Sequence, residues 1–189
     1  MTTIAFAIRR ASREDVSDLH AMIAALARYE KLSHLCVASE TDLDDALFGP
    51  LPAAEALVAR SGTQAAGFAL FFHTYSTFLG RRSLWLEDLF VQPDHRRKGC
   101  AKLLLRTLAE LAVERDCGRF EWAVLDWNAQ AIAFYQGLGA TVLPDWRIVR
   151  MVGPALTSFA SGIGPSQLGI QSALGTVEAA DPVGKGDAR

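Results

Sequence analysis

Residues 84–115 read LWLEDLFVQPDHRRKGCAKLLLRTLAELAVER, and this stretch decides the fold class. The apolar run over residues 83–91 predicts a buried strand, which Pro93 ends. A helix is predicted from Gly99 to about Arg115, because leucines recur there at helical spacing: Leu103, Leu104, Leu108 and Leu111. The sequence therefore predicts a strand, a basic loop and a long helix in succession.

Strand and helix patterns alternate around this unit. Short apolar runs predict strands at residues 5–9, 56–60, 65–74, 119–125, 141–143 and 147–152. Helical spacing predicts helices at residues 12–29, 41–48 and 129–138, the first of which begins at a capping-box pattern, Ser12-Arg-Glu-Asp15. We expect one mixed α/β (α+β) domain over residues 4–156. Residues 157–189 hold six of the 15 glycines and one aromatic residue, which predicts a weakly ordered tail.

The composition argues against several classes of protein. Lys and Arg number 19 against 21 Asp and Glu, and this net charge of −2 disfavours a nucleic-acid partner. We expect no membrane partner, since no stretch of about 18 uncharged apolar residues occurs and the N-terminus lacks the basic region of a signal peptide. The cysteines are scattered without metal-ligand spacing, at Cys36, Cys100 and Cys117. This pattern predicts a cytoplasmic location and no metal.

The basic loop is the first candidate for chemistry. Arg96, Arg97 and Lys98 precede Gly99, and the helix that follows offers free backbone N–H groups at its start, an arrangement that suits a pyrophosphate. Gly99 and Ala101 would let the backbone approach phosphate oxygens closely. A solvated turn is the alternative, because basic residues before a helix are common. The chain has neither a GKT/S motif nor a GxGxxG motif after its first strand.

Two adjacent acids interrupt the apolar strand before the loop. Glu87 and Asp88 would be costly to bury unless they are used or paired. Strand alternation sends them to opposite faces unless a bulge intervenes. The alternative to a catalytic role is a structural carboxylate.

A third pattern lies near residue 128. Asn128 precedes the helix predicted at residues 129–138 and can cap it. Tyr135 lies seven residues later, two turns along the same face. Packing alone would also explain a tyrosine there.

In this order the patterns resemble the GCN5-related N-acetyltransferase (GNAT) superfamily. Its acetyl-CoA loop reads Q/R-x-x-G-x-G/A, matched by Arg96, Gly99 and Ala101. A later N-x-x-A-x-x-F-Y helix is matched by Asn128, Ala131, Phe134 and Tyr135. The stretches YEKLS (29–33), LEDL (86–89) and AVLDWN (123–128) resemble the diamine (spermidine/spermine) and thialysine acetyltransferases, and the first and last look more like the thialysine branch. The likeness spans residues 8–152 and departs from the family pattern at Cys100, Ala101 and Gln130.

The resemblance implies a central, mostly antiparallel twisted sheet flanked by helices, with acetyl-CoA in a cleft between splayed strands. It implies that Glu87 is the base, that Tyr135 is the acid that protonates the thiolate, and that Asp88 is structural. The implied acetyl-CoA contacts are Leu89, Phe90, Val91, Arg96, Arg97, Lys98, Gly99, Cys100, Ala101, Lys102, Asn128 and Ala131. The implied amine contacts are Tyr29, Glu30, Glu87, Glu121, Trp122 and Ala123.

The expected activity is therefore acetyl transfer from acetyl-CoA to a primary amine of a small cationic substrate, a thialysine-like amino acid or a di- or polyamine. Two other functions stay open: a peptide or protein N-acetyltransferase of the same superfamily, and a noncatalytic acyl-CoA-binding module. Family members are commonly homodimers, so the resemblance also implies a homodimer.

Overall fold

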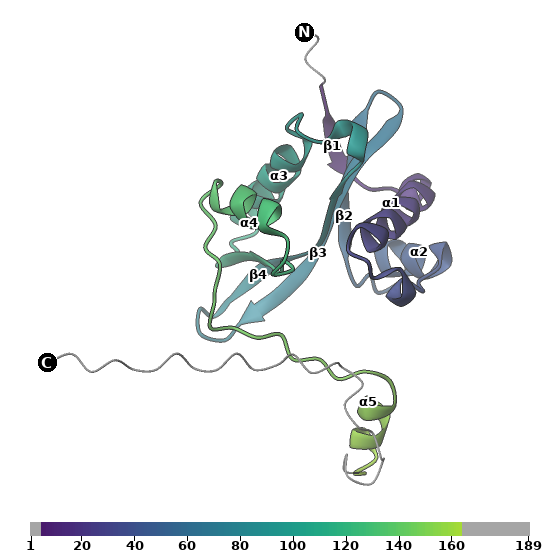
Figure 1. Ribbon diagram of the computed structural model, residues 1–189, viewed down its shortest axis with the longest axis vertical. Helices are drawn as coiled ribbons and strands as arrows, with labels where there is room; N and C mark the ends of the chain where they lie inside the picture. The colour runs from purple at the N-terminus through teal and green to yellow at the C-terminus, as the bar shows by residue number, and fades with distance from the viewer. Residues whose placement is uncertain (1–4, 164–189) are drawn as a thin grey trace, which may run out of the picture. The chain divides into compact units, whose positions relative to one another are not determined.

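The computed structural model describes residues 5–163 of the chain (Figure 1). The chain divides into two units, Met1–Phe134 and Tyr135–Arg189. The first unit contains a five-stranded sheet in the order β1-β2-β3-β4-β5. Its strands are β1 (Ala7–Arg10), β2 (Glu55–Ser61), β3 (Gln64–Ser76), β4 (Arg81–Val91) and β5 (Arg119–Trp122).

The sheet is mostly antiparallel, which confirms the predicted fold class. Strands β1 to β4 pair antiparallel with their neighbours, whereas β5 pairs parallel with β4. A parallel neighbour requires a crossover connection, and α3 (Cys100–Glu114) provides it. The strand–loop–helix unit predicted at residues 84–115 is thus the part of the chain that reverses the sheet's pairing direction.

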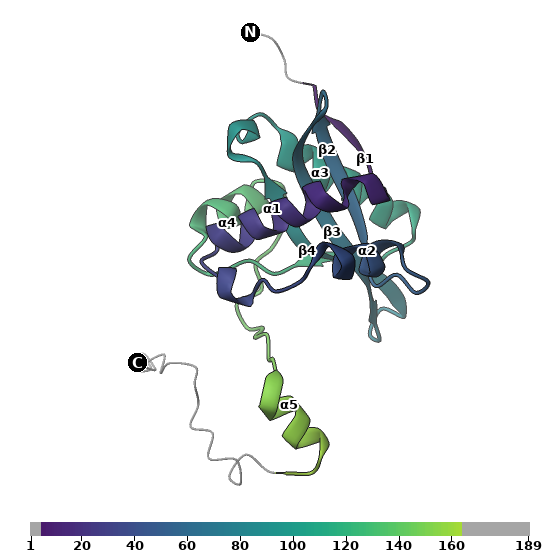
Figure 2. The same cartoon turned by 90° about the vertical axis from the view of Figure 1, so that its right-hand side faces the viewer.

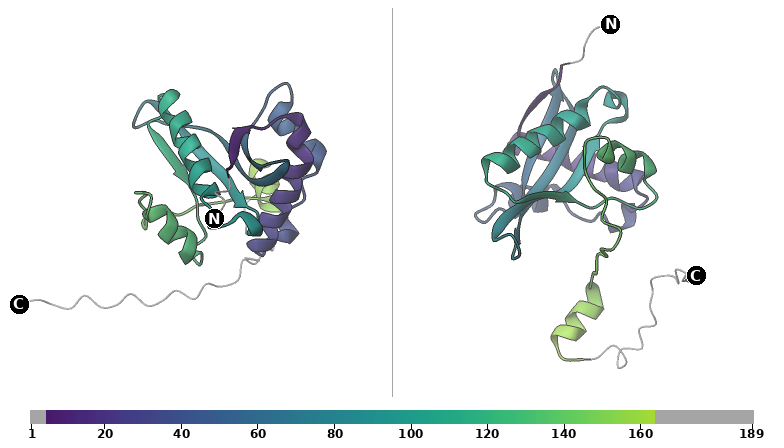
Figure 3. Two further views of the ribbon diagram at one scale, coloured as in Figure 1. Left: turned by 90° about the horizontal axis from the view of Figure 1, so that it is seen from above. Right: turned by 90° about the vertical axis from the view of Figure 1, so that its left-hand side faces the viewer.

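Helices cover both faces of the sheet. Helices α1 (Val16–Tyr29) and α2 (Glu40–Phe48) lie on one face, in front of the strands in Figure 2. Helix α3 lies on the other face, in front of the strands in the right panel of Figure 3. Short 3₁₀ turns occur at Arg13–Asp15, Ser33–Leu35 and Pro93–His95, and two further helices follow β5: α4 (Ala129–Gln136) and α5 (Gly153–Ala160).

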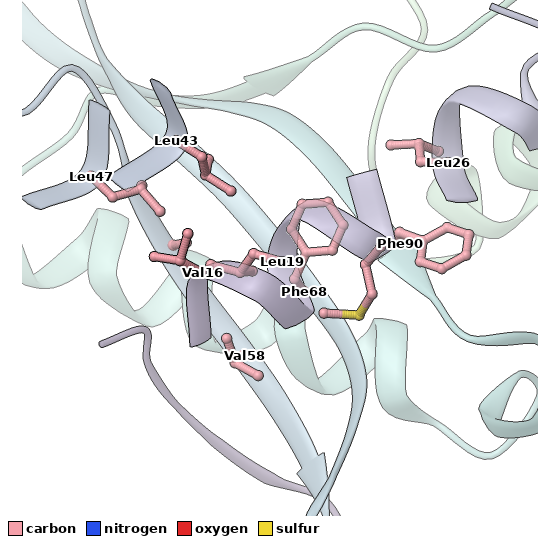
Figure 4. Close-up of a cluster of buried hydrophobic side chains, with 10 residues drawn as sticks. Val16, Leu19, Leu26, Leu43, Leu47, Val58, Phe68 and Phe90 are labelled. Carbon is pink, nitrogen blue, oxygen red and sulfur yellow. The ribbon is translucent and has the colours of Figure 1, made fainter. Parts of the chain in front are cut away.

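The core beneath α1 explains the helical spacing in the sequence. Four buried side chains of α1 face the sheet, and the strands supply Val58, Phe68 and Phe90 to the same cluster (Figure 4). The α1 members are Val16, Leu19, Met22 and Leu26. Their spacing of three, three and four residues places all of them on one helix face. This packing holds α1 against β3 and β4 as far as Leu26, the last buried residue of the helix.

The two strands predicted at residues 141–143 and 147–152 are not formed, and this prediction was wrong. Residues 141–152 have no helix or strand and are exposed. Alternating apolar residues make a strand only where a neighbouring strand pairs with the backbone, and none of the described strands does so here. Strand β5 also ends at Trp122 rather than at residue 125. Helix α5 continues to Ala160, within the stretch predicted as a tail, and residues 164–189 of that stretch lie outside the described residues.

A buried carboxylate joins β1, β2 and the start of α1. Asp15 is fully buried and accepts hydrogen bonds from Arg9 at 2.6 and 2.7 Å and from Arg60 at 2.5 Å. The Ser12 backbone N–H donates to the same carboxylate at 2.8 Å, as the capping-box pattern predicted. Burial alone would raise the pKa of Asp15, but the hydrogen bonds from Arg9, Arg60 and Ser12 outweigh it and hold the pKa well below its usual range.

We expect Asp15→Asn to lower the free energy of unfolding by about 2–4 kcal/mol at pH 7, because two arginines lose their buried partner. A depressed pKa in the folded state stabilises the protein fully above the unfolded-state value of about 3.9, and this contribution is lost as the pH falls below it. The difference between variant and wild type should therefore shrink in urea denaturation below about pH 4. Asp42→Asn is the matched control: Asp42 occupies the same position in the α2 capping box but is exposed. An equal loss in both variants would contradict the assignment.

Candidate active site

A β-bulge interrupts β4 at Glu87. In the antiparallel register, Leu86 lies opposite Phe71 and Asp88 lies opposite Leu70, so Glu87 has no partner residue on β3. An extra residue in one strand shifts the alternation of side chains that follows. Strand β4 therefore contains a bulge of one residue, the exception to regular alternation named above.

The bulge turns both acids to the α1 face of the sheet. Before it, Trp85 points opposite to Leu86, and its indole Nε1 donates to the Glu87 carboxylate at 2.9 Å. After it, Asp88 lies on the same face as Phe90, two residues along, whose ring lies in the core beneath α1. Glu87 and Asp88 thus share one face, which continuous alternation would have prevented.

A third carboxylate joins them from the end of α1. Glu30 follows the last residue of α1, and its charge acts on Asp88 together with that of Glu87. Burial raises the pKa of Asp88, and the charges of Glu87 and Glu30 raise it further, to about 6. Burial also raises the pKa of Glu30. Glu30, Glu87 and Asp88 are called the acidic cluster below.

Asp88 differs from the structural carboxylate that the resemblance implied. Within residues 5–163, no hydrogen bond or salt bridge to its side chain is formed, whereas the structural Asp15 accepts five hydrogen bonds. A half-buried carboxylate without a donor is kept at a cost in stability. This combination is typical of functional sites, and only the unexpected pair of acids within an apolar strand signalled it in the sequence.

One edge of β4 is open beside the acidic cluster. The parallel pairing with β5 runs only from Ser83 to Leu86, and β5 ends at Trp122. Beyond this point β4 continues to Val91 with β3 on one side and none of the described strands on the other. Backbone N–H and C=O groups of a strand point alternately to its two sides, so only alternate residues of Leu89–Val91 present theirs at the open edge. The Val91 carbonyl already accepts a hydrogen bond from Arg96 Nε at 2.9 Å.

The end of β5 carries the other predicted amine contacts. Glu121 lies opposite Trp85 in the parallel register and forms a salt bridge with Arg119 at 3.3 Å. Trp122 packs on Phe120 with a centroid distance of 4.9 Å, and Ala123 follows as an exposed residue. The structure therefore places this group at the point where β5 separates from β4.

The basic loop and the start of α3 have the form that the sequence predicted. Gly99 adopts a φ of +88°, a conformation that favours glycine, and is the N-cap of α3. The first backbone N–H groups of α3, at Cys100, Ala101 and Lys102, precede the first intrahelical bond from Leu103 to Gly99. The side chain of Cys100 is buried, and burial raises the pKa of its thiol to about 11, so only its backbone N–H can serve a ligand.

Arg96 is exposed, as its neighbours Arg97 and Lys98 are, but its side chain also contacts two aromatic rings. Its guanidinium lies 5.1 Å from the Tyr29 ring centroid and 5.5 Å from that of Phe90, and its Nε donates to the Val91 carbonyl at 2.9 Å. The basic loop predicted Arg96 as a phosphate cation, and no pattern in the sequence indicated these aromatic contacts. Arg97 and Lys98 of the loop and Lys102 of α3 are exposed cations as well.

The start of α4 lies next to this aromatic group. Trp127 has its ring centroid 6.1 Å from that of Tyr29. Asn128 follows it and caps α4, since its Oδ1 accepts the Ala131 backbone N–H at 3.2 Å, as predicted. Tyr135 lies near the end of α4 and is the first residue of the second unit.

Comparison with known proteins identifies the family. A model of the acetyltransferase (GNAT) family matches residues 21–140. The chain belongs to the GNAT acetyltransferase family. The thialysine N-epsilon-acetyltransferase of Mus musculus is 37% identical over 164 residues, covering 81% of this chain and 96% of the relative. The L-ornithine N5-acetyltransferase NATA1 of Arabidopsis thaliana is 34% identical, covering 79% and 85%.

The fold comparison agrees with the family. The solved structure of an integron cassette protein from the mobile metagenome of V. cholerae matches with a TM-score of 0.70 and 26% identity, over 85% of this chain and 99% of that one. This GNAT protein is an N-acetyltransferase, and the predicted resemblance to thialysine-type members is confirmed. GNAT enzymes use acetyl-CoA, and the free N–H groups of α3, the exposed loop cations and the open edge of β4 fit that group.

Two features are absent from the described part of the chain. None of its helices is long and apolar enough to cross a membrane. No group of three or more His, Cys, Asp or Glu side chains in residues 5–163 is arranged to hold a metal ion.

We expect Asp88→Asn to stabilise this GNAT enzyme by roughly 1–2 kcal/mol at pH 8. A carboxylate with a raised pKa in the folded state costs stability above the unfolded-state value of about 4, and the cost is complete once the pH exceeds about 6. The gain should therefore vanish below about pH 4 in thermal denaturation measured against pH. Asp94→Asn, an exposed acid in the following loop, is the control and should show no gain. A loss of stability in Asp88→Asn at pH 8 would show that the carboxylate is structural.

Proposed function

We propose that the enzyme transfers an acetyl group from acetyl-CoA to a primary amine of a small cationic substrate, a thialysine-like amino acid or a di- or polyamine. The observation that carries the proposal is the acidic cluster. Two carboxylates on the α1 face of β4 and a third at the end of α1, beside the open edge of β4, favour a ligand with more than one positive charge. The relatives named for thialysine and ornithine acetylation support a diamine-type amino acid among the candidates.

Selection of the amine would fall to the residues around this cluster. Glu30 and Glu87 attract the ammonium groups, and Tyr29 offers an aromatic face to a cation. Glu121, Trp122 and Ala123, at and just after the end of β5, would supply the remaining contacts. A short amino-acid substrate and a longer polyamine would differ in how many of these residues they reach.

Glu87 would be the base. Alkylammonium groups have a pKa of about 10.4, so freeing the amine at pH 7 costs about 4–5 kcal/mol. The Trp85 indole holds the Glu87 carboxylate through one hydrogen bond and leaves its other oxygen able to accept a proton, directly or through water. The neutral amine then attacks directly, without a covalent enzyme intermediate.

The other predicted residues would hold and activate the acetyl donor. Acetyl-CoA supplies an activated acetyl group as a thioester. The free N–H groups of α3 at Cys100, Ala101 and Lys102 would bind its pyrophosphate, with Arg97 and Lys98 supplying charge. A backbone N–H within Leu89–Val91 would stabilise the oxyanion, Asn128 and Ala131 would line the donor at the start of α4, and the Tyr135 hydroxyl would protonate the departing thiolate.

The first experiment is a screen for CoA release from acetyl-CoA with thialysine, ornithine, spermidine, lysine and a lysine peptide. We expect release with at least one of the first three well above lysine. A preference for the peptide would instead indicate a protein acetyltransferase. Tight CoA binding without acetylation of any amine would indicate a noncatalytic acyl-CoA-binding module, and either result would overturn the proposal.

The best substrate then tests the assigned residues. We expect Glu87→Gln and Tyr135→Phe each to lower kcat by about 10²–10⁴-fold, because each removes a proton-transfer group, with CoA affinity nearly unchanged in calorimetry. Arg106→Gln, on the exposed surface of α3 in a salt bridge with Glu110, is the control. Unchanged turnover in Tyr135→Phe would remove it from the mechanism.

We also propose a homodimer, on the family resemblance alone. Light scattering should then give twice the mass of the chain, and a monomer mass at working concentration would contradict this proposal.

A further inference from the structure

The contacts of Arg96 connect the loop proposed to bind acetyl-CoA with the end of α1 proposed to bind the amine. Its backbone belongs to the loop that leads into α3, where the Arg96 N–H bonds to the Pro93 carbonyl at 3.2 Å. Its guanidinium lies against Tyr29 at the end of α1 and against Phe90 of β4. The loop before α3, residues 92–99, is called the donor loop below, because acetyl-CoA is the acetyl donor. The Arg96 side chain therefore joins the donor loop to strand β4 and to the end of α1 that carries Tyr29 and Glu30.

The loop is shaped so that a bound donor would hold Arg96 in place. Arg97 has a φ of +57° and Gly99 one of +88°, so two of the three residues after Arg96 adopt left-handed conformations. The bond from Arg96 Nε to the Val91 carbonyl closes the loop at its base. Phosphate binding at the start of α3 would restrain this short segment and, with it, the guanidinium.

The end of α1 has few other restraints. Tyr29 is 41% exposed, and the helix stops there in a turn through Lys31, whose φ is +62°. The Tyr29 ring has Arg96 on one side and Trp127 at 6.1 Å. The position of the Tyr29 ring, and that of Glu30 beside it, therefore depends on how firmly the loop restrains the Arg96 side chain.

We propose that Arg96 is a positioning residue that couples the two substrates: donor binding at the loop orders Tyr29 and Glu30 through the Arg96 stack, so that CoA raises the affinity for the cationic amine. This inference rests on the proposed function for the identity of the amine side. Linkage requires the reciprocal effect, so that the amine raises the affinity for CoA by the same factor. Contacts of a cation with two aromatic rings can supply a coupling of about three- to tenfold.

The ordering of α1 by CoA can be tested without any amine, by measuring amide hydrogen exchange at the end of α1 with and without CoA. The amides of Glu30, Lys31 and Leu32 bond to carbonyls of α1 and report its order. Saturating CoA should slow exchange in the peptide covering residues 26–32 of the wild type. The protection should disappear in Arg96→Gln and in Tyr29→Leu, which breaks the stack from the other side and leaves the donor loop unchanged. Arg97→Gln, which removes the same charge from the same loop without a ring contact, should keep it.

The second test is calorimetry of the amine that the screen identifies, with and without CoA, which forms a ternary complex that cannot react. The wild type should bind the amine about three- to tenfold more tightly with CoA, and Arg96→Gln and Tyr29→Leu should bind it equally in both cases, within about 1.5-fold.

A purely structural Arg96 would lower the melting temperature and leave the coupling intact, which overturns the inference. Absence of CoA protection in wild-type α1 also overturns it, whatever the substrate. Failure of every amine in the screen, with α1 protection present, would instead discard the proposed function alone.

Discussion

The extra residue in β4 is the constraint on which the site depends. A strand presents alternate side chains to its two faces, and a regular β4 would place Asp88 and Phe90 with Leu86, on the α3 face. The bulge at Glu87 turns Phe90 into the core under α1 and brings both acids to that face. The same position is where β5 stops pairing with β4. One inserted residue therefore sets the position of the acids, and the open backbone edge begins beside it.

Two buried or half-buried carboxylates show opposite solutions to the same physical problem. Asp15 is surrounded by arginines and a backbone N–H, and it ties β1, β2 and α1 together. Asp88 has two like charges near it and no donor within the described residues, so its ionised form is disfavoured. The first arrangement stabilises the fold, and the second uses some of that stability to keep a site that attracts cations.

The aromatic contacts of Arg96 connect the loop before α3 with the end of α1 and with β4. The donor loop and the end of α1 are far apart in sequence, yet a single guanidinium lies between Tyr29 and Phe90. A residue in such a place transmits restraint from one element to the other, because the rings lose contact if either element moves. The site is then one unit in which the order of α1 depends on the loop.

The sequence alone determined the local elements, since helical spacing, capping boxes and the loop before α3 depend on neighbours within a few residues. The leucines of α3, the Ser12–Asp15 cap and the Asn128 cap were all predictable for this reason. The motifs at Arg96–Ala101 and Asn128–Tyr135 likewise predicted the family. Tertiary structure decided where β4 bulges, which rings receive Arg96, and that residues 141–152 form no strand. Each of these depends on which distant backbone or ring lies alongside, and residues far apart in the chain carry no local signal of that pairing.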